Sequence, residues 1–129
     1  MHFSDYVEAY NTNDKDAKGH YFTDDITVEG AHGSLEGKEA VLAFFADAHS
    51  EAKERLRPLV VVEQGEHIMA EFDAEFVAKK DILADSMLGE LTEGEAAKLR
   101  FFAVYKLRDG LICEMRLAIW PQPERIEPF

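Results

Sequence analysis

The fold is decided by residues 98–120, which read KLRFFAVYKLRDGLICEMRLAIW. Apolar and polar side chains alternate through both halves of this stretch, as they do in a β-strand with one buried face. The dipeptide Asp109-Gly110 separates the two halves and is typical of a tight hairpin turn. The stretch therefore predicts two antiparallel strands, 98–107 and 111–120.

A third long strand is predicted before this hairpin. Residues 67–79 read HIMAEFDAEFVAK, in which Ala and Phe alternate with Glu and Asp. Shorter apolar runs predict further strands at 26–29 and 59–62, and Pro121 and Pro123 are expected to close the last strand. Strands joined by short turns form an antiparallel meander, so most of the second half of the chain is expected to be sheet.

Helices are expected mainly in the first half of the chain. Four apolar residues recur with helical spacing and form the stripe Phe3, Tyr6, Val7 and Tyr10. Further helices are expected at 16–22 and from 38 to about 54, whereas residues 81–95 follow neither period and predict a loop or short helix over an opening. The pattern predicts an α+β fold with a curved sheet, in a single domain spanning residues 1–129.

The two faces of the sheet can be assigned from charge. Opposite charges on neighbouring strands favour one face, which holds Glu71, Asp73, Glu75, Lys98, Arg100 and Arg116. The helices are then expected to pack on the other face, which holds Phe72, Phe76, Phe101, Tyr105, Met115, Leu117 and Ile119. The outer face also carries an apolar group of Phe102, Val104, Ile112, Ala118 and Trp120. Such a patch suggests a partner sheet, so we expect a homodimer through the outer sheet face.

Composition limits the class of partner. The chain has 129 residues, and 14 Lys and Arg against 26 Asp and Glu give a formal net charge of −12. Such a surface repels phosphate backbones and anionic lipid, so neither nucleic acid nor a membrane is expected as a partner. A lone cysteine, Cys113, excludes an internal disulfide and is expected to be a buried thiol. With no signal peptide or long apolar span in the sequence, a cytoplasmic protein is expected.

Motifs for metal, phosphate or nucleophilic chemistry are missing from the sequence. Residues 33–39 are one residue short of a phosphate-binding loop, with Glu39 where Ser or Thr should hold magnesium. Four of the histidines are scattered without zinc-ligand spacing: His20, His32, His49 and His67. No metal and no cofactor are therefore expected.

Four stretches in order, 5–14, 21–29, 35–45 and 105–114, resemble the nuclear-transport-factor-2-like superfamily. Together they identify the chain as similar to its SnoaL-like members over nearly its whole length. The resemblance implies a cone-shaped, curved antiparallel sheet wrapped around three N-terminal helices, a cystatin-like α+β roll with a deep apolar pocket. Enzymes of this superfamily place one or two polar groups in that pocket and stabilise an enolate or transfer a proton without metal.

The sequence departs from the catalytic patterns of these enzymes. Tyr6 falls on the hydrogen-bonding tyrosine of ketosteroid isomerase, but Gly30 and Ala103 stand where that enzyme has its two aspartates. Leu117 stands where polyketide cyclases and epoxide hydrolases keep an aspartate. Asp73 aligns with another hydrolase aspartate, although its strand parity places it on the outer face. Whether Asp73 or Glu29 reaches the pocket stays open.

Two functions therefore remain. The first is non-catalytic binding of a small apolar molecule, or a dimeric interaction domain, and the lack of a charged group placed in the pocket favours it slightly. The second is a cofactor-free isomerase or cyclase-type enzyme in which Tyr6 donates to an oxyanion and His32 is the base. In both, the expected pocket residues are Tyr10, Phe72, Phe76, Phe101, Tyr105, Met115 and Ile119.

Overall fold

The computed structural model describes residues 1–31 and 33–129. Within them the helices are α1 (Phe3–Asn11), α2 (Lys15–Gly19) and α3 (Lys38–Glu51). The strands are β1 (Phe22–Gly30), β2 (Gly33–Glu36), β3 (Ala52–Gln64), β4 (His67–Ala78), β5 (Ala96–Arg108) and β6 (Leu111–Ile126). No helix in this part of the chain is both long and apolar enough to cross a membrane.

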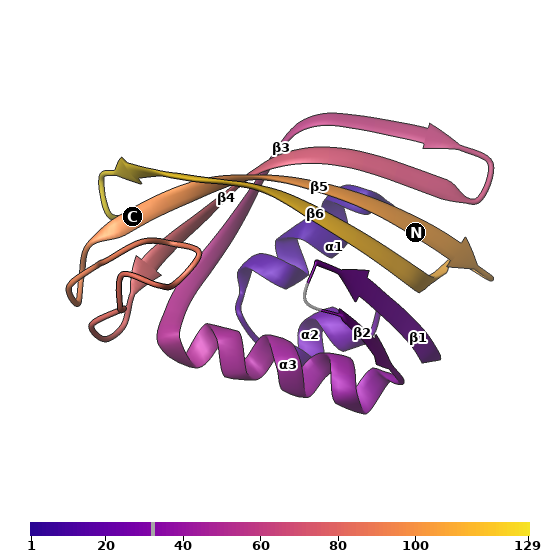
Figure 1. The fold of residues 1–129 in the computed structure, drawn as a ribbon. Helices are drawn as coiled ribbons and strands as arrows, with labels where there is room; N and C mark the ends of the chain where they lie inside the picture. Colours follow the sequence, from indigo (N-terminus) through magenta and orange to yellow (C-terminus); the bar gives the residue numbers. More distant parts are fainter. Residues whose placement is uncertain (32) are drawn as a thin grey trace.

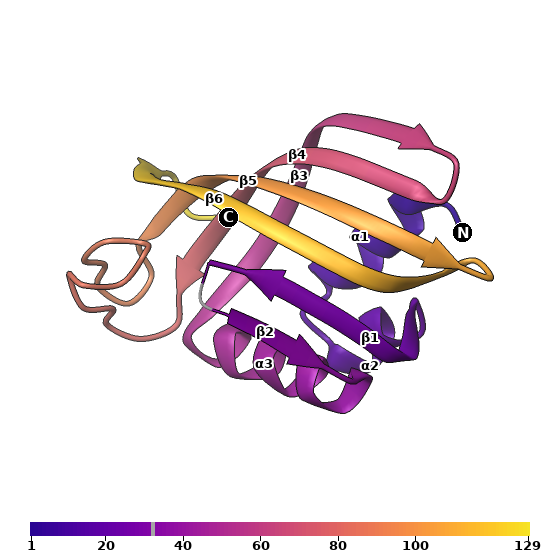
Figure 2. The ribbon, with the colours of Figure 1, turned by 45° about the vertical axis from the view of Figure 1, so that its right-hand side comes forward.

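The six strands form one curved sheet in the order β2-β1-β6-β5-β4-β3, and the helices lie within its curve (Figures 1 and 2). The predicted α+β fold is confirmed. Neighbouring strands are antiparallel except β1 and β6, which run parallel. The sheet is mixed because β1 pairs with β6, the last strand of the meander β3-β4-β5-β6, and the two strands run in the same direction.

Several element boundaries differ from those predicted. Strand β3 begins at Ala52, directly after α3, so residues 52–54 are strand rather than helix. Strand β6 continues to Ile126, so the expectation that Pro121 and Pro123 end it is wrong. The prolines are tolerated because β1 ends at Gly30, and beyond that point no described strand pairs with this edge of β6.

The segment between β4 and β5 is the loop that the sequence predicts. It contains an isolated bridge between Ile82 and Leu91, both of which are buried, so the loop packs against the body of the domain.

The outer sheet face carries most of the predicted cross-strand ion pairs. The Arg100 guanidinium lies 2.6 Å from Glu71 and 3.3 Å from Asp73, and Lys98 lies 3.5 Å from Asp73. Glu75 pairs instead with Arg55 of β3, at 2.9 Å.

The prediction that Ile112 lies on the outer face is wrong, because its side chain is fully buried. A register shift between Lys106 and Leu107 changes the parity of β6 at this point and turns Ile112 inward. Cys113 is buried, as predicted.

Candidate functional site

A cavity of about 240 Å³ lies between α3 and the inner face of the sheet. Its wall is mostly apolar, and its larger members are Phe44, Phe45, Phe76, Leu99, Phe101 and Ile119. Its polar side chains are Tyr10, Ser34 and Glu54. A small cavity with an apolar wall and few polar groups is the usual form of a small-molecule site.

Strand alternation turns Glu54 toward this cavity. Ala52, Glu54 and Leu56 are buried on one face of β3, while Lys53 and Arg57 are exposed on the other. Glu54 exposes only 6% of its surface. A carboxylate so far removed from water is costly unless hydrogen bonds compensate it.

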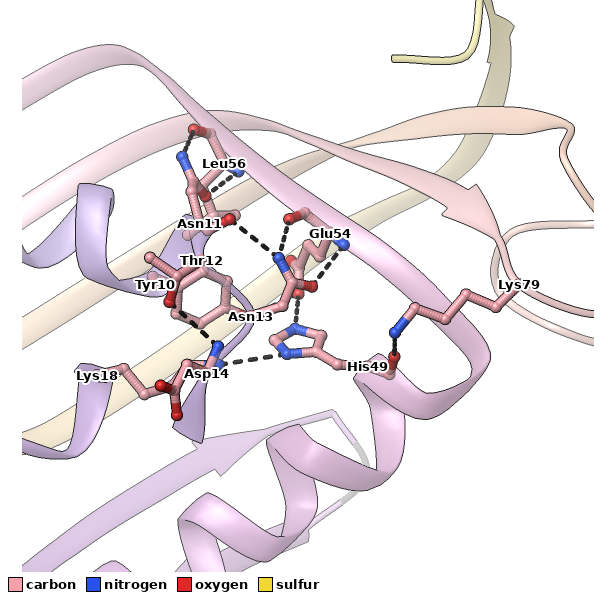
Figure 3. A network of polar contacts seen from close by, with 10 residues as sticks. All are labelled: Tyr10, Asn11, Thr12, Asn13, Asp14, Lys18, His49, Glu54, Leu56 and Lys79. Atoms are coloured by element: carbon pink, nitrogen blue, oxygen red, sulfur yellow. Dashed lines mark hydrogen bonds and ion pairs between the residues drawn. The ribbon is translucent and has the colours of Figure 1, made fainter. Parts of the chain in front are cut away.

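Two asparagines at the end of α1 fix the backbone around Glu54 (Figure 3). The side-chain oxygen of Asn13 accepts from the Glu54 backbone N–H at 2.9 Å, and its amide donates to the Glu54 carbonyl at 2.9 Å. Asn11 makes the same pair of bonds with Leu56, at 2.8 and 3.0 Å. These side chains pair with the free edge of β3 as a neighbouring strand would, which anchors the inward-facing residues.

The Glu54 carboxylate is held by two other elements. Tyr10 of α1 donates its hydroxyl to Oε1 at 2.7 Å. His49 of α3 places Nε2 2.8 Å from the same oxygen. The second oxygen, Oε2, is hydrogen-bonded by no described residue, and it is not among the buried polar atoms without a partner. Oε2 is therefore the atom that Glu54 offers to the cavity.

His49 in turn contacts a buried lysine. On α3, Val41, Phe45 and His49 form the buried stripe, one turn apart from each other. Lys18 Nζ lies 3.2 Å from His49 Nδ1, and Lys18 has no exposed surface. Helix α2 can bring Lys18 this close because Gly19 faces Leu42, where a Cβ would lie only 3.0 Å from the leucine side chain.

Burial perturbs two groups of this cluster. The pKa of Tyr10 is raised well above its ordinary value, first by burial and then by the adjacent charge of Glu54. The pKa of Lys18 is lowered from 10.5 to about 8, because burial outweighs the attraction of Glu54 and Asp14. The Lys18 ammonium lies 4.4 Å from the centre of the Tyr10 ring and 5.2 Å from that of Phe45. Both contacts favour the charged form.

The structure brings together only some of the site residues expected from sequence. Those that line the cavity are Tyr10, Phe76, Phe101 and Ile119. Phe72, Tyr105 and Met115 are buried in the core and do not belong to its lining. Asp73 lies in the outer ion pairs, and Glu29 is exposed.

Neither member of the expected catalytic pair is seen in the cavity. Tyr6 packs against Phe3, Phe22 and Tyr105, with ring centroids 5.7–5.9 Å apart. Burial, and then the adjacent Tyr105, raise its pKa. His32 lies outside the described residues. The oxyanion and base roles of Tyr6 and His32 stay predictions.

Sequence reasoning missed Lys18, His49 and Glu54. A signal was present for two of them: His49 continues the helical stripe of Val41 and Phe45, and Glu54 alternates with the charged residues of β3. In residues 1–31 and 33–129, no cluster of three or more His, Cys, Asp or Glu side chains could hold a metal ion.

Comparisons with known proteins agree with this architecture. A candidate polyketide cyclase from Silicibacter sp. TM1040 shares 24% identity at a TM-score of 0.77, over 92% of this chain and 85% of that one. A second candidate polyketide cyclase, from Xanthomonas campestris, shares 24% identity at a TM-score of 0.76, over 90% of this chain and 85% of that one. An LEH-like epoxide hydrolase from Mycobacterium tuberculosis shares 12% identity at a TM-score of 0.71, over 92% of this chain and 79% of that one. At these identities the likeness concerns the fold.

No protein of curated function matches the sequence. The family model for the SnoaL-like domain matches residues 3–115, which is most of the chain and includes every residue of the polar cluster around Glu54. The chain therefore belongs to the SnoaL-like domain family and has the fold of the NTF2-like proteins.

Proposed function

We propose that the protein binds a small, largely apolar molecule in the cavity and catalyses a cofactor-free proton transfer on it, with Glu54 as the base. One observation carries this proposal. Among the described residues that line the cavity, Glu54 is the one carboxylate in a mainly apolar wall, with one oxygen held by Tyr10 and His49 and the other open. The roles predicted for Tyr6 and His32 stay separate predictions, and this proposal does not depend on them.

The chemistry follows from this placement. A carboxylate can act as a general base toward a carbon acid bound beside it, and the apolar wall of the cavity limits competition from water. Oε2 takes a proton from a carbon next to a carbonyl. The electron pair of the C–H bond becomes the carbon–carbon π bond of an enolate, and the π pair of the carbonyl moves onto its oxygen. Glu54 then returns that proton, or a solvent proton that has exchanged with it, to the molecule at the same or another carbon, so no cofactor is consumed.

Non-catalytic binding is the competing function, and the apolar wall alone supports it. The catalytic and the binding function differ in the role of Glu54. If Glu54 is a base, turnover depends on it, whereas if it is only a binding group, affinity alone depends on it. An experiment must therefore measure occupancy and proton transfer separately.

The test uses cyclohexanone, a neutral carbon acid small enough for the cavity. Its α-protons exchange with D₂O when a base removes them, and proton NMR follows their loss. We expect the protein to accelerate this exchange and Glu54→Gln to reduce the acceleration by at least about 100-fold, as for loss of a general base. Glu75→Gln is the matched control, because Glu75 is also buried but pairs with Arg55 outside the cavity.

The outcomes separate the functions. Binding of cyclohexanone without accelerated exchange would leave a binding protein and refute the catalytic proposal. Equal acceleration by Glu54→Gln and the wild type would refute the role of Glu54. Absence of both binding and exchange would refute the cavity as a site for this class of molecule.

We also propose that a second copy of the chain packs on the outer sheet face. Trp120 and Met69 expose 58% and 53% of their surfaces there, and the Phe102 ring packs against Trp120 with centroids 5.2 Å apart. Exposed apolar groups beside the ion pairs of Arg100 form a patch that a symmetry-related copy would cover.

A further inference from the structure

Lys18, His49 and Glu54 form a buried chain that the proposed reaction does not by itself require. Lys18 Nζ lies 3.2 Å from His49 Nδ1, and His49 Nε2 lies 2.8 Å from Glu54 Oε1 (Figure 3). All three side chains are buried. A surface ion pair would have little effect on a site, but a buried chain fixes both charge and orientation.

The hydrogen bonds of this chain have only one consistent direction. An ammonium group has donors and no acceptor, so Lys18 must donate to His49 Nδ1. Nδ1 then carries no proton, and the proton of the neutral imidazole sits on Nε2. Nε2–H therefore donates to Glu54 Oε1, which also accepts from the Tyr10 hydroxyl.

The charges balance over the same three residues. The ammonium of Lys18 carries one positive charge and the carboxylate of Glu54 one negative charge, with a neutral imidazole between them. The other ionisable groups that contact these three residues or interact with their charges are Tyr6, Tyr10, Asp14, Lys79 and Tyr105. The Lys79 ammonium donates to the His49 carbonyl at 2.6 Å. The pKa of Lys18, lowered to about 8, leaves it mostly protonated at neutral pH.

We propose that Lys18 is a positioning residue that fixes His49 as its Nε2–H tautomer, keeps Glu54 an ionised acceptor, and thereby restricts the cavity to neutral ligands. A cationic ligand would add a second positive charge beside a carboxylate whose charge Lys18 already balances. A ligand anion would meet Oε2 directly. A neutral molecule that presents a hydroxyl or an acidic C–H to Oε2 leaves the balance intact. This ligand class rests on the proposed function, but the tautomer does not.

The tautomer is tested without any ligand. Nitrogen-15 NMR of the imidazole distinguishes protonated from unprotonated ring nitrogens, and we expect His49 of the wild type at pH 7 to carry its proton on Nε2 alone. In Lys18→Met the donor to Nδ1 is lost, and the single tautomer should give way to a mixture or to the doubly protonated ring. Lys79→Met is the matched control, because Lys79 contacts only the backbone of His49.

A proton on Nδ1 in the wild type would overturn the proposal, and so would an unchanged tautomer in Lys18→Met. The wild-type measurement alone decides the direction of the hydrogen bonds between Lys18, His49 and Glu54, even where the variant does not fold.

Ligand charge is tested with cyclohexanol, cyclohexylammonium and cyclohexanecarboxylate, which share one ring and differ in charge. We expect the wild type to bind cyclohexanol most tightly. In Lys18→Met the affinity for cyclohexylammonium relative to cyclohexanol should rise by at least about tenfold, because the carboxylate has lost its internal cation. Tighter binding of either ion by the wild type would refute the selection of neutral ligands. If none of the three binds, the proposed function fails and the NMR result alone decides the role of Lys18.

Discussion

Replacement of Asn13 should separate the two roles of this residue, which are backbone geometry and strand anchoring. Its φ is +62°, in the left-handed region that glycine tolerates and alanine resists. Its side chain makes two hydrogen bonds to the Glu54 backbone. Asn13→Gly removes the bonds and keeps the conformation, whereas Asn13→Ala removes the bonds and adds strain.

The size of each effect follows from these contacts. Asn13→Gly removes the two bonds to Glu54 and the bond that the Asn13 amide donates to the Asn11 carbonyl at 3.1 Å, and it leaves a partly buried backbone N–H without its partner. This should lower the free energy of unfolding by about 2–3 kcal/mol. Alanine should lower it by about a further 1 kcal/mol because of the left-handed φ. Asn11→Ala is the matched control: it removes the equivalent bonds to Leu56, which is not a polar site residue.

Urea unfolding measures the free energies, and cyclohexanol binding measures the site. We expect Asn11→Ala and Asn13→Gly to destabilise the fold similarly, while only the change at Asn13 weakens binding, because only Asn13 holds the backbone of Glu54. An Asn13→Gly variant as stable as the wild type would show that water replaces these bonds at no cost. An Asn13→Ala variant no less stable than Asn13→Gly would contradict the strain.

Two other predictions concern charge and assembly. The native pKa of Lys18 is about 8 and its ordinary value is 10.5, so between these values the unfolded chain binds more protons and wild-type stability rises with pH. Urea unfolding of the wild type and of Lys18→Met gives the difference between their unfolding free energies (wild type minus variant). This difference should increase by about 2 kcal/mol from pH 7 to about pH 9.5. A difference that does not change with pH would refute the lowered pKa of Lys18. On the outer face, Trp120→Asp should convert a dimer to a monomer in sedimentation velocity, whereas a wild type that sediments as a monomer at micromolar concentration would refute the dimer.

The sheet was the predictable part of this protein because strand alternation is a local signal. The parity of 67–79 and 98–107 places Phe72, Phe101 and Asp73 on the faces where the structure has them. Ile112 escaped this reasoning because a single register shift reverses the parity of every residue on one side of it.

The polar cluster was harder to predict because it depends on where a helix becomes a strand. Residues 38–54 are rich in helix formers, and α3 passes into β3 without an intervening turn. If the helix is extended to residue 54, Glu54 is assigned to a helix face. The alternation of Ala52, Glu54 and Leu56 with charged neighbours is the local signal that favours a strand instead. This signal is weak because it rests on only three inward-facing residues.

Lys18 could not have been predicted from its neighbours in sequence. A lysine in a five-residue helix is normally exposed, and its burial here results from the approach of α2 to α3 at Gly19. Tertiary packing, which has no local signature, decides its environment.

The position of the polar groups distinguishes this chain from the enzymes that it resembles. Those enzymes were expected to carry their aspartates on the sheet, at positions where this chain has Gly30, Ala103 and Leu117. Gly30 and Leu117 are here part of the cavity lining and add no charge to it. The cluster around Glu54 comes instead from α1, α2, α3 and the start of β3, whereas Gly30 and Leu117 belong to β1 and β6. A substrate that reacts at Glu54 must then place its acidic carbon toward the start of β3 and its apolar body toward the rest of the cavity wall, so inhibitors shaped for an aspartate on β1, β5 or β6 should not fit this site.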